Sequence, residues 1–362
     1  MDSNITGHPI RTDRLTDREK ARLDGGPDLE TETRKQQIGG SMNIQWYPGH
    51  MTKAKRAMQE DLKLIDLIIE LVDARVPLSS RNPDIDQLGR GKARLVLLNK
   101  SDMADERYSE AWAGYFKDQG CHVVKVNSRS GSGLKQINAA VQEACREKIE
   151  RDRRRGILNR PVRAMVVGIP NVGKSTFINS FAGKACAKTG NKPGVTKGNQ
   201  WIRLSKTLEL LDTPGILWPR FEDQSVGLKL AFIGSINDEI LQKEELAAEL
   251  LRFLAGAYPK ALETRYGLEL SLEETGLSQA YQGLEAIARA RGCLTKGSGL
   301  DTAKAAALLL DDFRSGRLGR ITLELPPGCE RTAGARKALE DSERNSETDS
   351  KTAKTHSPRE DG

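Results

Sequence analysis

Short apolar runs and longer amphipathic stretches alternate along residues 64–215. Five of the runs predict buried strands, at 64–74, 94–102, 122–131, 162–168 and 207–215. Helical spacing appears between several of them, at 104–119, 132–150 and 174–183. This alternation predicts an α/β domain with a mostly parallel sheet and helices on both faces. Ligands of such a sheet bind beyond the carboxyl ends of its strands.

The pattern changes near residue 236 to helices without strands between them. Three helical stretches follow one another, at 238–259, 277–293 and 301–316. The last has Asp301 as a candidate N-cap and Gly316 as a stop signal. We therefore expect an α/β domain at 42–235 and a small all-helical domain at 236–331, closed by a short segment at 321–326.

Composition separates both ends from this folded middle. Residues 1–41 contain no aromatic residue, and residues 332–362 have only Leu339 as a large aliphatic side chain. Neither stretch buries enough apolar surface to offset the entropy of ordering, so both are predicted to be disordered. The net charge of +7 and the pI near 9.1 are weak signs of a polyanionic partner, because charged runs are usually solvated faces.

The lack of targeting signals and the cysteine usage both indicate a cytoplasmic protein. No run of 18 apolar residues exists, which excludes a membrane span, and the first residues lack the apolar core of a secretory signal. The five cysteines are scattered without a Cys-x-x-Cys pair, and an odd number does not suggest a disulfide framework.

A glycine-rich phosphate-binding loop follows the predicted strand 162–168. Residues 168–175, Gly-Ile-Pro-Asn-Val-Gly-Lys-Ser, match G-x-x-x-x-G-K-S and open a helix. Backbone N–H groups of such a loop surround phosphates at the positive end of the helix, and Lys174 reaches the β and γ phosphates. The candidate nucleotide-binding residues of this loop and its helix are Asn171, Val172, Gly173, Lys174, Ser175 and Thr176.

The Asp-Thr-Pro-Gly sequence at 212–215 ends the next clear strand and supplies candidate magnesium ligands. Asp212 would hold Mg²⁺ directly or through water, together with the Ser175 hydroxyl, and the Gly215 N–H would lie near the γ phosphate. Thr196 is a candidate second hydroxyl ligand from the intervening loop, although Pro-Gly-x-Thr is also ordinary loop chemistry.

The sequence Asn-Lys-Ser-Asp at 99–102 indicates which base is bound. Guanine presents two donors on its Watson–Crick edge, and the two oxygens of Asp102 accept both, whereas adenine offers neither donor. Asn99 would brace the loop, the Lys100 stem would lie against a ring face, and Ser128 would present its backbone N–H to the guanine 6-oxo group. Asp102 thus disfavours an ATPase or a kinase.

The order of these motifs resembles a known family. An ordinary Ras-like GTPase has its P-loop first and N-K-x-D near its end, whereas here N-K-x-D precedes the P-loop. Three further segments strengthen the resemblance, namely Trp-Tyr-Pro-Gly-His-Met at 46–51, Asp-Ala-Arg-Val-Pro at 73–77 and Asp-Phe-Arg-Ser-Gly-Arg-Leu-Gly-Arg at 312–320. The chain is similar to the circularly permuted GTPases of ribosome assembly over residues 42–326, which implies a permuted Ras-like P-loop fold.

The resemblance also implies roles that the residues alone leave open. His50 is implied to be catalytic, the alternative being a helix-entry residue bonded to nearby backbone. Asn171 is implied to help hold K⁺ beside the phosphates, the alternative being a loop-stabilising residue. The implied partner is the large ribosomal subunit, with its rRNA and proteins, which would stimulate GTP hydrolysis.

Two functions stay open from the sequence. Ras-type enzymes orient the attacking water with a glutamine, and Ile216 stands at that place, so unassisted hydrolysis should be slow. The first function is an assembly GTPase of the large ribosomal subunit. The alternative is an RNA-binding scaffold with structural nucleotide and negligible hydrolysis. The basic residues Arg289, Arg291, Arg314, Arg317 and Arg320 near helix ends suit RNA contact, but the helix dipole alone also explains them.

Overall fold

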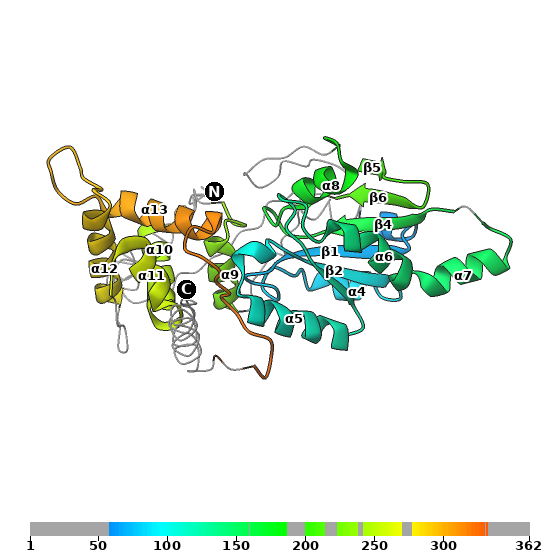
Figure 1. The fold of residues 1–362 in the computed structure, drawn as a ribbon, viewed down its shortest axis with the longest axis horizontal. Coiled ribbons are helices and arrows are strands. Elements are labelled where there is room, and N and C mark those ends of the chain that lie inside the picture. Colours follow the sequence, from blue (N-terminus) through cyan, green and yellow to red (C-terminus); the bar gives the residue numbers. More distant parts are fainter. Residues whose placement is uncertain are drawn as a thin grey trace, which may run out of the picture. The chain divides into compact units, whose positions relative to one another are not determined.

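A computed structural model describes residues 58–158, 160–186, 200–213, 223–237, 242–269, 277–329 and 331 of the chain. Their centre is a six-stranded sheet, shown in Figure 1. The strands are β1 (Leu67–Asp73), β2 (Ala93–Asn99), β3 (His122–Lys125), β4 (Val162–Val167), β5 (Gln200–Arg203) and β6 (Leu208–Asp212). Their order in space is β3-β2-β1-β4-β6-β5. All neighbours are parallel except β5 and β6.

The mostly parallel sheet confirms the fold predicted from the sequence, and four of the five predicted strands are central or next to the centre. Strands β1, β2, β4 and β6 carry few or no exposed side chains, as expected for strands covered on both faces. Strand β5 was not predicted. Its burial pattern is exposed except at Ile202, and an antiparallel edge strand of that kind lacks a continuous apolar run.

Helices connect and cover these strands. They are α4 (Asp84–Leu88), the 3₁₀ helix η1 (Ser101–Met103), α5 (Glu106–Asp118), α6 (Leu134–Ala144), α7 (Arg146–Arg154), α8 (Lys174–Ala182) and α9 (Gln224–Phe232). The single helix predicted at 132–150 is therefore two helices. Cys145 ends α6 with φ of −104°, and its N–H still donates to the Val141 carbonyl.

One face of the sheet packs against α5. Val72 of β1 and Val96 and Leu98 of β2 form a buried cluster with Trp112 and Phe116 of this helix. Because strand side chains alternate, Leu95 and Leu97 of β2 lie on the opposite face, and both are fully buried too. The carboxyl ends of β1, β2 and β4 are thus fixed from two sides.

Four further helices follow the sheet: α10 (Lys243–Ala257), α11 (Pro259–Tyr266), α12 (Leu277–Ala290) and α13 (Thr302–Ser315). The predicted caps of α13 are confirmed. The Asp301 side chain accepts from the Lys304 N–H at 2.9 Å, and Gly316 closes the helix at φ of +80°. All the described residues belong to one compact unit, so the boundary at 235/236 stays a prediction.

The segment Ile321–Glu324, which we call the strap, bonds back to the loops after β1 and β2. The Ile321 N–H donates to the Met103 carbonyl at 2.9 Å, and the Leu323 N–H donates to the Arg75 carbonyl at 2.8 Å. Thr322 Oγ1 accepts from the Asp105 N–H at 3.1 Å. Within the part of the chain that the structure describes, no helix is long and apolar enough to cross a membrane.

Candidate functional site

The phosphate-binding loop runs from the end of β4 to the first turn of α8. Gly173 has φ of +103°, and a Cβ atom there would lie 2.5 Å from Asn99 Nδ2. A Cβ atom on Gly168 would lie 2.7 Å from the Leu71 carbonyl oxygen. Both glycines are therefore required by close packing, and the loop is held against the ends of β1 and β2. Ser175 and Thr176 are half-buried in the first turn of α8, beside Lys174.

Lys174 and Asp212 form the charged centre of this loop. The Lys174 ammonium donates to the carbonyls of Gly168 at 3.0 Å and Ile169 at 3.2 Å. Burial lowers the pKa of Lys174 to about 8, although the charge of Asp212 opposes the shift. Burial raises the pKa of Asp212, and Lys174 opposes that shift in turn. Each group thus depends on the other, or on a bound ion, to stay charged.

The residues present fit a magnesium ion. Asp212 is 1% exposed, and its Oδ1 atom has no hydrogen-bond partner among the described residues. A carboxylate oxygen and the Ser175 hydroxyl are the hard oxygen ligands that Mg²⁺ takes beside phosphates. No group of three His, Cys, Asp or Glu side chains suited to a metal occurs within the described ranges, so phosphate and water would complete the shell.

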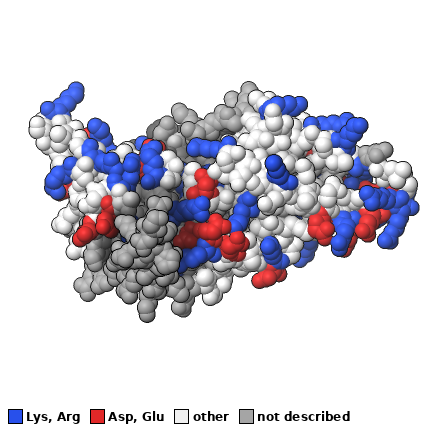
Figure 2. All heavy atoms as spheres, viewed as in Figure 1, with Lys and Arg blue, Asp and Glu red and all other residues white. Residues whose placement is uncertain are grey.

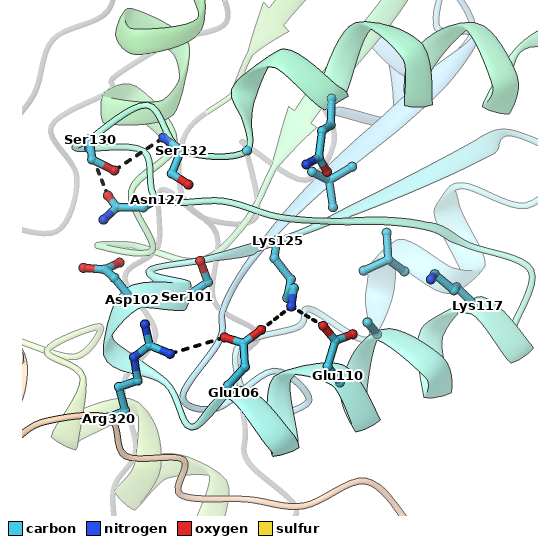
Figure 3. A pocket seen from close by; sticks show the side chains of 15 residues that line it. Ser101, Asp102, Glu106, Glu110, Lys117, Lys125, Asn127, Ser130, Ser132 and Arg320 are labelled. Atoms are coloured by element: carbon cyan, nitrogen blue, oxygen red, sulfur yellow. Dashed lines mark hydrogen bonds and ion pairs between the residues drawn. The ribbon is translucent and has the colours of Figure 1, made fainter. Parts of the chain in front are cut away.

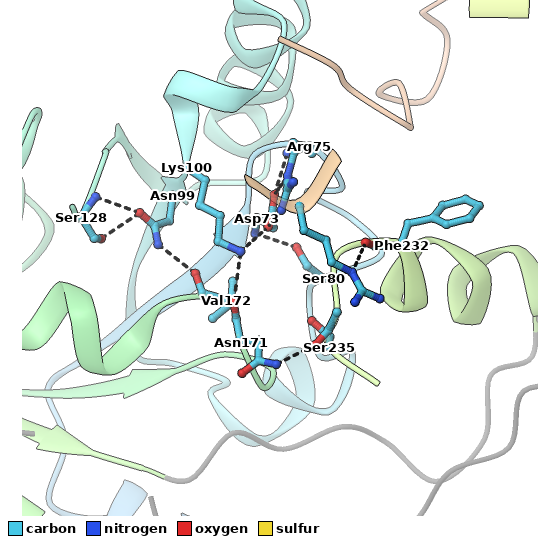
Figure 4. Close-up of polar contacts among 12 residues, drawn as sticks. Asp73, Arg75, Ser80, Asn99, Lys100, Ser128, Asn171, Val172, Phe232 and Ser235 are labelled. Carbon is cyan, nitrogen blue, oxygen red and sulfur yellow. Dashed lines mark hydrogen bonds and ion pairs between the residues drawn. The ribbon is translucent and has the colours of Figure 1, made fainter. Parts of the chain in front are cut away.

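Asn99 joins the base-binding and phosphate-binding motifs. Its Nδ2 donates to the Val172 carbonyl of the phosphate loop at 2.8 Å, and its Oδ1 accepts from Ser128 Oγ at 2.8 Å (Figure 4). Asn99 and Ser128 are both nearly fully buried. Ser180 of α8 completes the link, because its hydroxyl donates to the Ser128 carbonyl at 2.6 Å. The bracing role predicted for Asn99 corresponds to these bonds.

The N–H group of Ser128 differs from the expectation. It donates to Asn99 Oδ1 at 3.2 Å instead of pointing free toward a guanine 6-oxo group. The next two N–H groups, of Arg129 and Ser130, both donate to Asn127 Oδ1. The Asn127 side chain closes this local turn, whereas the acceptor of the Ser128 N–H is Asn99, 29 residues earlier. Recognition of the 6-oxo group by Ser128 requires its N–H to be shared or redirected.

Asp102 lies in η1 with an exposed side chain, at the rim of a cavity of about 610 Å³ (Figure 3). The cavity runs along the edge strand β3 between α5 and α6. Lys125 crosses it and pairs with Glu106 and Glu110, and Arg320 reaches Glu106 at 3.4 Å. Asp102 is thus accessible for a base, at the end of the same loop that carries Asn99.

Asn171 has two proposed roles, and the structure supplies a partner for one of them. Its Nδ2 donates to the Gly234 carbonyl at 2.6 Å, just after α9, and its backbone adopts φ of +58°. This bond supports the loop-stabilising interpretation. The potassium site stays a prediction. Three other predicted residues, His50, Thr196 and Gly215, lie outside the described residues.

Among the basic residues near the helix ends, Arg314 is not available for RNA. Its Nε donates to the Phe232 carbonyl at 3.0 Å and its Nη2 to the Ala231 carbonyl at 2.7 Å, both at the end of α9. Arg289, Arg291, Arg317 and Arg320 are exposed. Figure 2 shows Lys and Arg side chains over the helical part and, at the other end of the view, near α7. These bonds support a structural role for Arg314, and RNA contact by the exposed arginines stays a prediction.

Asp73 and Arg75 contact the site through Lys100, a connection that was not predicted. Asp73 ends β1, is fully buried, and accepts from Arg75 and from Lys100. The signal was present as the Asp-Ala-Arg sequence at a strand end, where ligand-facing residues of a parallel sheet are expected. Its partner Lys100 lies 27 residues away, which no local pattern reveals.

Comparisons with known proteins agree with this geometry. A family model described as 50S ribosome-binding GTPase matches residues 163–254. Ribosome biogenesis GTPase A of Bacillus cereus is 50% identical over 285 residues, covering 79% of this chain and 95% of that protein. The protein of the same name from Priestia megaterium is 49% identical over 290 residues, covering 80% of this chain and 99% of that protein.

Solved structures extend the likeness to the fold. The GNP-bound YlqF from Thermotoga maritima has a TM-score of 0.54 and 29% identity, and covers 76% of this chain and 99% of that chain. A GDP-bound structure of YlqF also has a TM-score of 0.54, with 28% identity. The motif order, the sheet and these relatives together lead to one conclusion: the chain belongs to the ribosome biogenesis GTPase A family of circularly permuted P-loop GTPases.

Proposed function

We propose that this GTPase binds GTP between the loops of residues 99–102 and 168–175, hydrolyses it to GDP and phosphate, and acts in late maturation of the large ribosomal subunit. The observation that carries the proposal is the position of Asn99, which bonds to both Val172 and Ser128. These bonds hold the loop that ends in Asp102 beside the phosphate loop, as one nucleotide requires.

The chemistry is positioning and charge stabilisation. Lys174 and the N–H groups of the loop would bind the β and γ phosphates, and Asp212 and Ser175 would hold Mg²⁺, which would supply positive charge beside the phosphates. Ile216 stands where a water-orienting glutamine would be. Hydrolysis is accordingly slow until the ribosomal subunit binds, and His50 is the candidate catalytic residue of this step.

The base assignment is tested with Asp102→Asn. The variant loses two charge-assisted hydrogen bonds to guanine, each worth about 1.5–3 kcal/mol, so GDP affinity should fall roughly 100-fold or more. Xanthosine diphosphate is the matched control, since its 2-oxo group accepts from an asparagine amide, and its affinity should rise. Unchanged preference for GDP would sink the assignment.

The ribosomal role is supported by the names of the relatives and by the exposed arginines at 289, 291, 317 and 320. We assign RNA contact to residues 236–331 and a cytoplasmic location to the protein. In gradient co-sedimentation, we expect binding to large subunits with a non-hydrolysable GTP analogue, and release with GDP. Nucleotide-independent binding without stimulated turnover would instead favour the RNA-binding scaffold.

The roles of Mg²⁺ and K⁺ in hydrolysis can be tested separately in the same turnover assay. Removal of Mg²⁺ by chelation should abolish hydrolysis, because Asp212 Oδ1 is buried without a hydrogen-bond partner among the described residues, as suits a carboxylate oxygen that ligates the ion. Replacing K⁺ by Na⁺ tests Asn171. Equal turnover in the two salts would contradict the potassium role and favour the loop-stabilising role, to which the bond to Gly234 belongs.

A further inference from the structure

Asp73 gathers two cations that come from different motifs. Arg75 donates to it twice, Nε to Oδ1 at 2.9 Å and Nη2 to Oδ2 at 2.8 Å. The Lys100 ammonium donates to Oδ2 at 2.9 Å (Figure 4). Asp73 and Arg75 are almost completely buried, and Lys100 is about one-fifth exposed. The Asp73 carboxylate therefore holds the ammonium group of Lys100, the lysine of the base-binding motif.

Lys100 is constrained both at its backbone and at its ammonium group. Its backbone adopts φ of +57° and ψ of +35°, a left-handed conformation that residues other than glycine rarely keep without support from their surroundings. Its ammonium also donates to the Asn171 carbonyl of the phosphate loop at 3.0 Å. These contacts extend the lysine across the site, where its stem forms a platform for a base ring.

Arg75 connects this arrangement to helix α13. Its Nη1 donates to the Phe313 carbonyl at 3.0 Å, and its guanidinium lies over the Phe313 ring, 4.9 Å from the centroid. The same guanidinium thus bonds to the Asp73 carboxylate with one edge and to the end of α13 with the other. A shift of α13 therefore changes the position of Asp73 and, through it, of Lys100.

The positions of the Arg75 and Lys100 side chains depend on the negative charge of Asp73. Burial alone would raise the pKa of Asp73, but Arg75 and then Lys100 outweigh this effect and keep the pKa well below its usual range. The carboxylate is thus ionised at any working pH. Without it, two cations would share a buried space, and Lys100, the more exposed one, would move away.

We propose that Asp73 is a positioning residue for guanine-nucleotide binding, acting through Lys100, and that Arg75 makes this position depend on helix α13. The proposal rests on the proposed function, since it takes Lys100 to contact the base. GDP and GTP share their base, so both lose affinity equally when the position is lost. A partner bound near the end of α13 would consequently change nucleotide residence for both forms.

The experiment is a double-mutant cycle of Asp73→Asn and Lys100→Met, with dissociation constants for GDP and a non-hydrolysable GTP analogue. Interaction energies between contacting groups correspond to about 10- to 100-fold changes, so Asp73→Asn should weaken both nucleotides by such a factor. In the Lys100→Met background the same change should alter affinity less than about twofold. Additive effects, or a loss confined to GTP, would overturn the proposal.

A second pair of an aspartate and a lysine, in α7, provides a matched control. Asp152 forms an ion pair with Lys148 within α7, with Oδ2 and Nζ 3.0 Å apart, outside both nucleotide-binding motifs. Asp152→Asn should leave both dissociation constants unchanged. Asp102→Asn in the same assay separates two failures, because unchanged affinity there rejects the proposed function, whereas a loss there with an additive Asp73 cycle rejects only the positioning role.

A second cycle covers the case in which thermal denaturation shows that Asp73→Asn is unfolded. Arg75→Lys keeps the charge beside Asp73, but a single ammonium cannot replace the fork that bonds to both Asp73 and Phe313. We expect a loss of about 3- to 10-fold for both nucleotides, absent in the Lys100→Met background. A loss that persists in that background would contradict the proposal equally.

Discussion

At the scale of single residues, Gly173 shows how the two nucleotide-binding motifs constrain each other. Its Cβ position is filled by the Asn99 amide, at 2.5 Å, and its φ is +103°. Gly173→Ala should therefore push Asn99 away from Val172 and abolish measurable GDP binding in calorimetry. Gly183→Ala is the control: it too has a positive φ, of +66°, but its Cβ has open space. It should cost about 1 kcal/mol of stability and leave affinity intact.

The depressed pKa of Lys174 predicts a pH dependence of nucleotide binding. The protonated amine binds phosphate, and its pKa is about 8. Below pH 8 the amine is already charged. Above it, binding requires proton uptake, so GDP affinity should fall about fivefold between pH 8 and 9. Lys174→Arg, which stays protonated, should bind with a flat profile over that range. A flat wild-type profile would contradict the low pKa.

A site residue was predictable when its partners lie close to it in the sequence. The residues of the P-loop form one short segment, and so do those of N-K-x-D, and each segment directly follows a predicted strand. The role of Asp73 was not predictable, since its partner Lys100 lies 27 residues away, after the end of β2. Arg314 was assigned to RNA contact because a basic pattern does not show which carbonyls lie nearby.

At the scale of elements, helix α13 is fixed to α9 by Arg314. The guanidinium bonds to carbonyls of Ala231 and Phe232 at the negative end of α9, where a cation is favoured. Arg314→Met should lower the free energy of unfolding by about 1.5–3 kcal/mol in denaturant titration, since charged hydrogen bonds are lost. The exposed Arg320→Met should change stability little but weaken RNA binding at low salt. The reverse result would restore Arg314 as a contact residue.

Strands rich in apolar residues were predictable, and a mostly exposed one was not. Strands β1, β2, β4 and β6 have such runs, whereas β5 is buried only at Ile202. The break between α6 and α7 at Cys145 leaves helical spacing unchanged on both sides, so the sequence showed one helix. Helix α9 (Gln224–Phe232) was missed because it follows the last strand closely and precedes the change of pattern near residue 236.

At the scale of the molecule, the strap joins parts of the chain that are far apart in sequence. Thr322 Oγ1 accepts from the N–H of Asp105, directly after the base-binding loop. Thr322→Val keeps the shape but leaves that N–H unpaired, which costs about 1–3 kcal/mol. We expect lower stability in thermal unfolding together with weaker binding of both GDP and GTP. Thr302→Val, which removes a bond to Glu244, should lower stability alone.

The strap has a consequence for how the chain is made. Synthesis delivers β1, β2 and the base-binding loop first, the phosphate loop next, and the residues that bond to Met103, Arg75 and Asp105 only after α13. An unfinished chain therefore lacks the contacts that hold its first loops in place. The loops after β1 and β2 therefore reach their full set of contacts only after residue 324 has left the ribosomal exit tunnel.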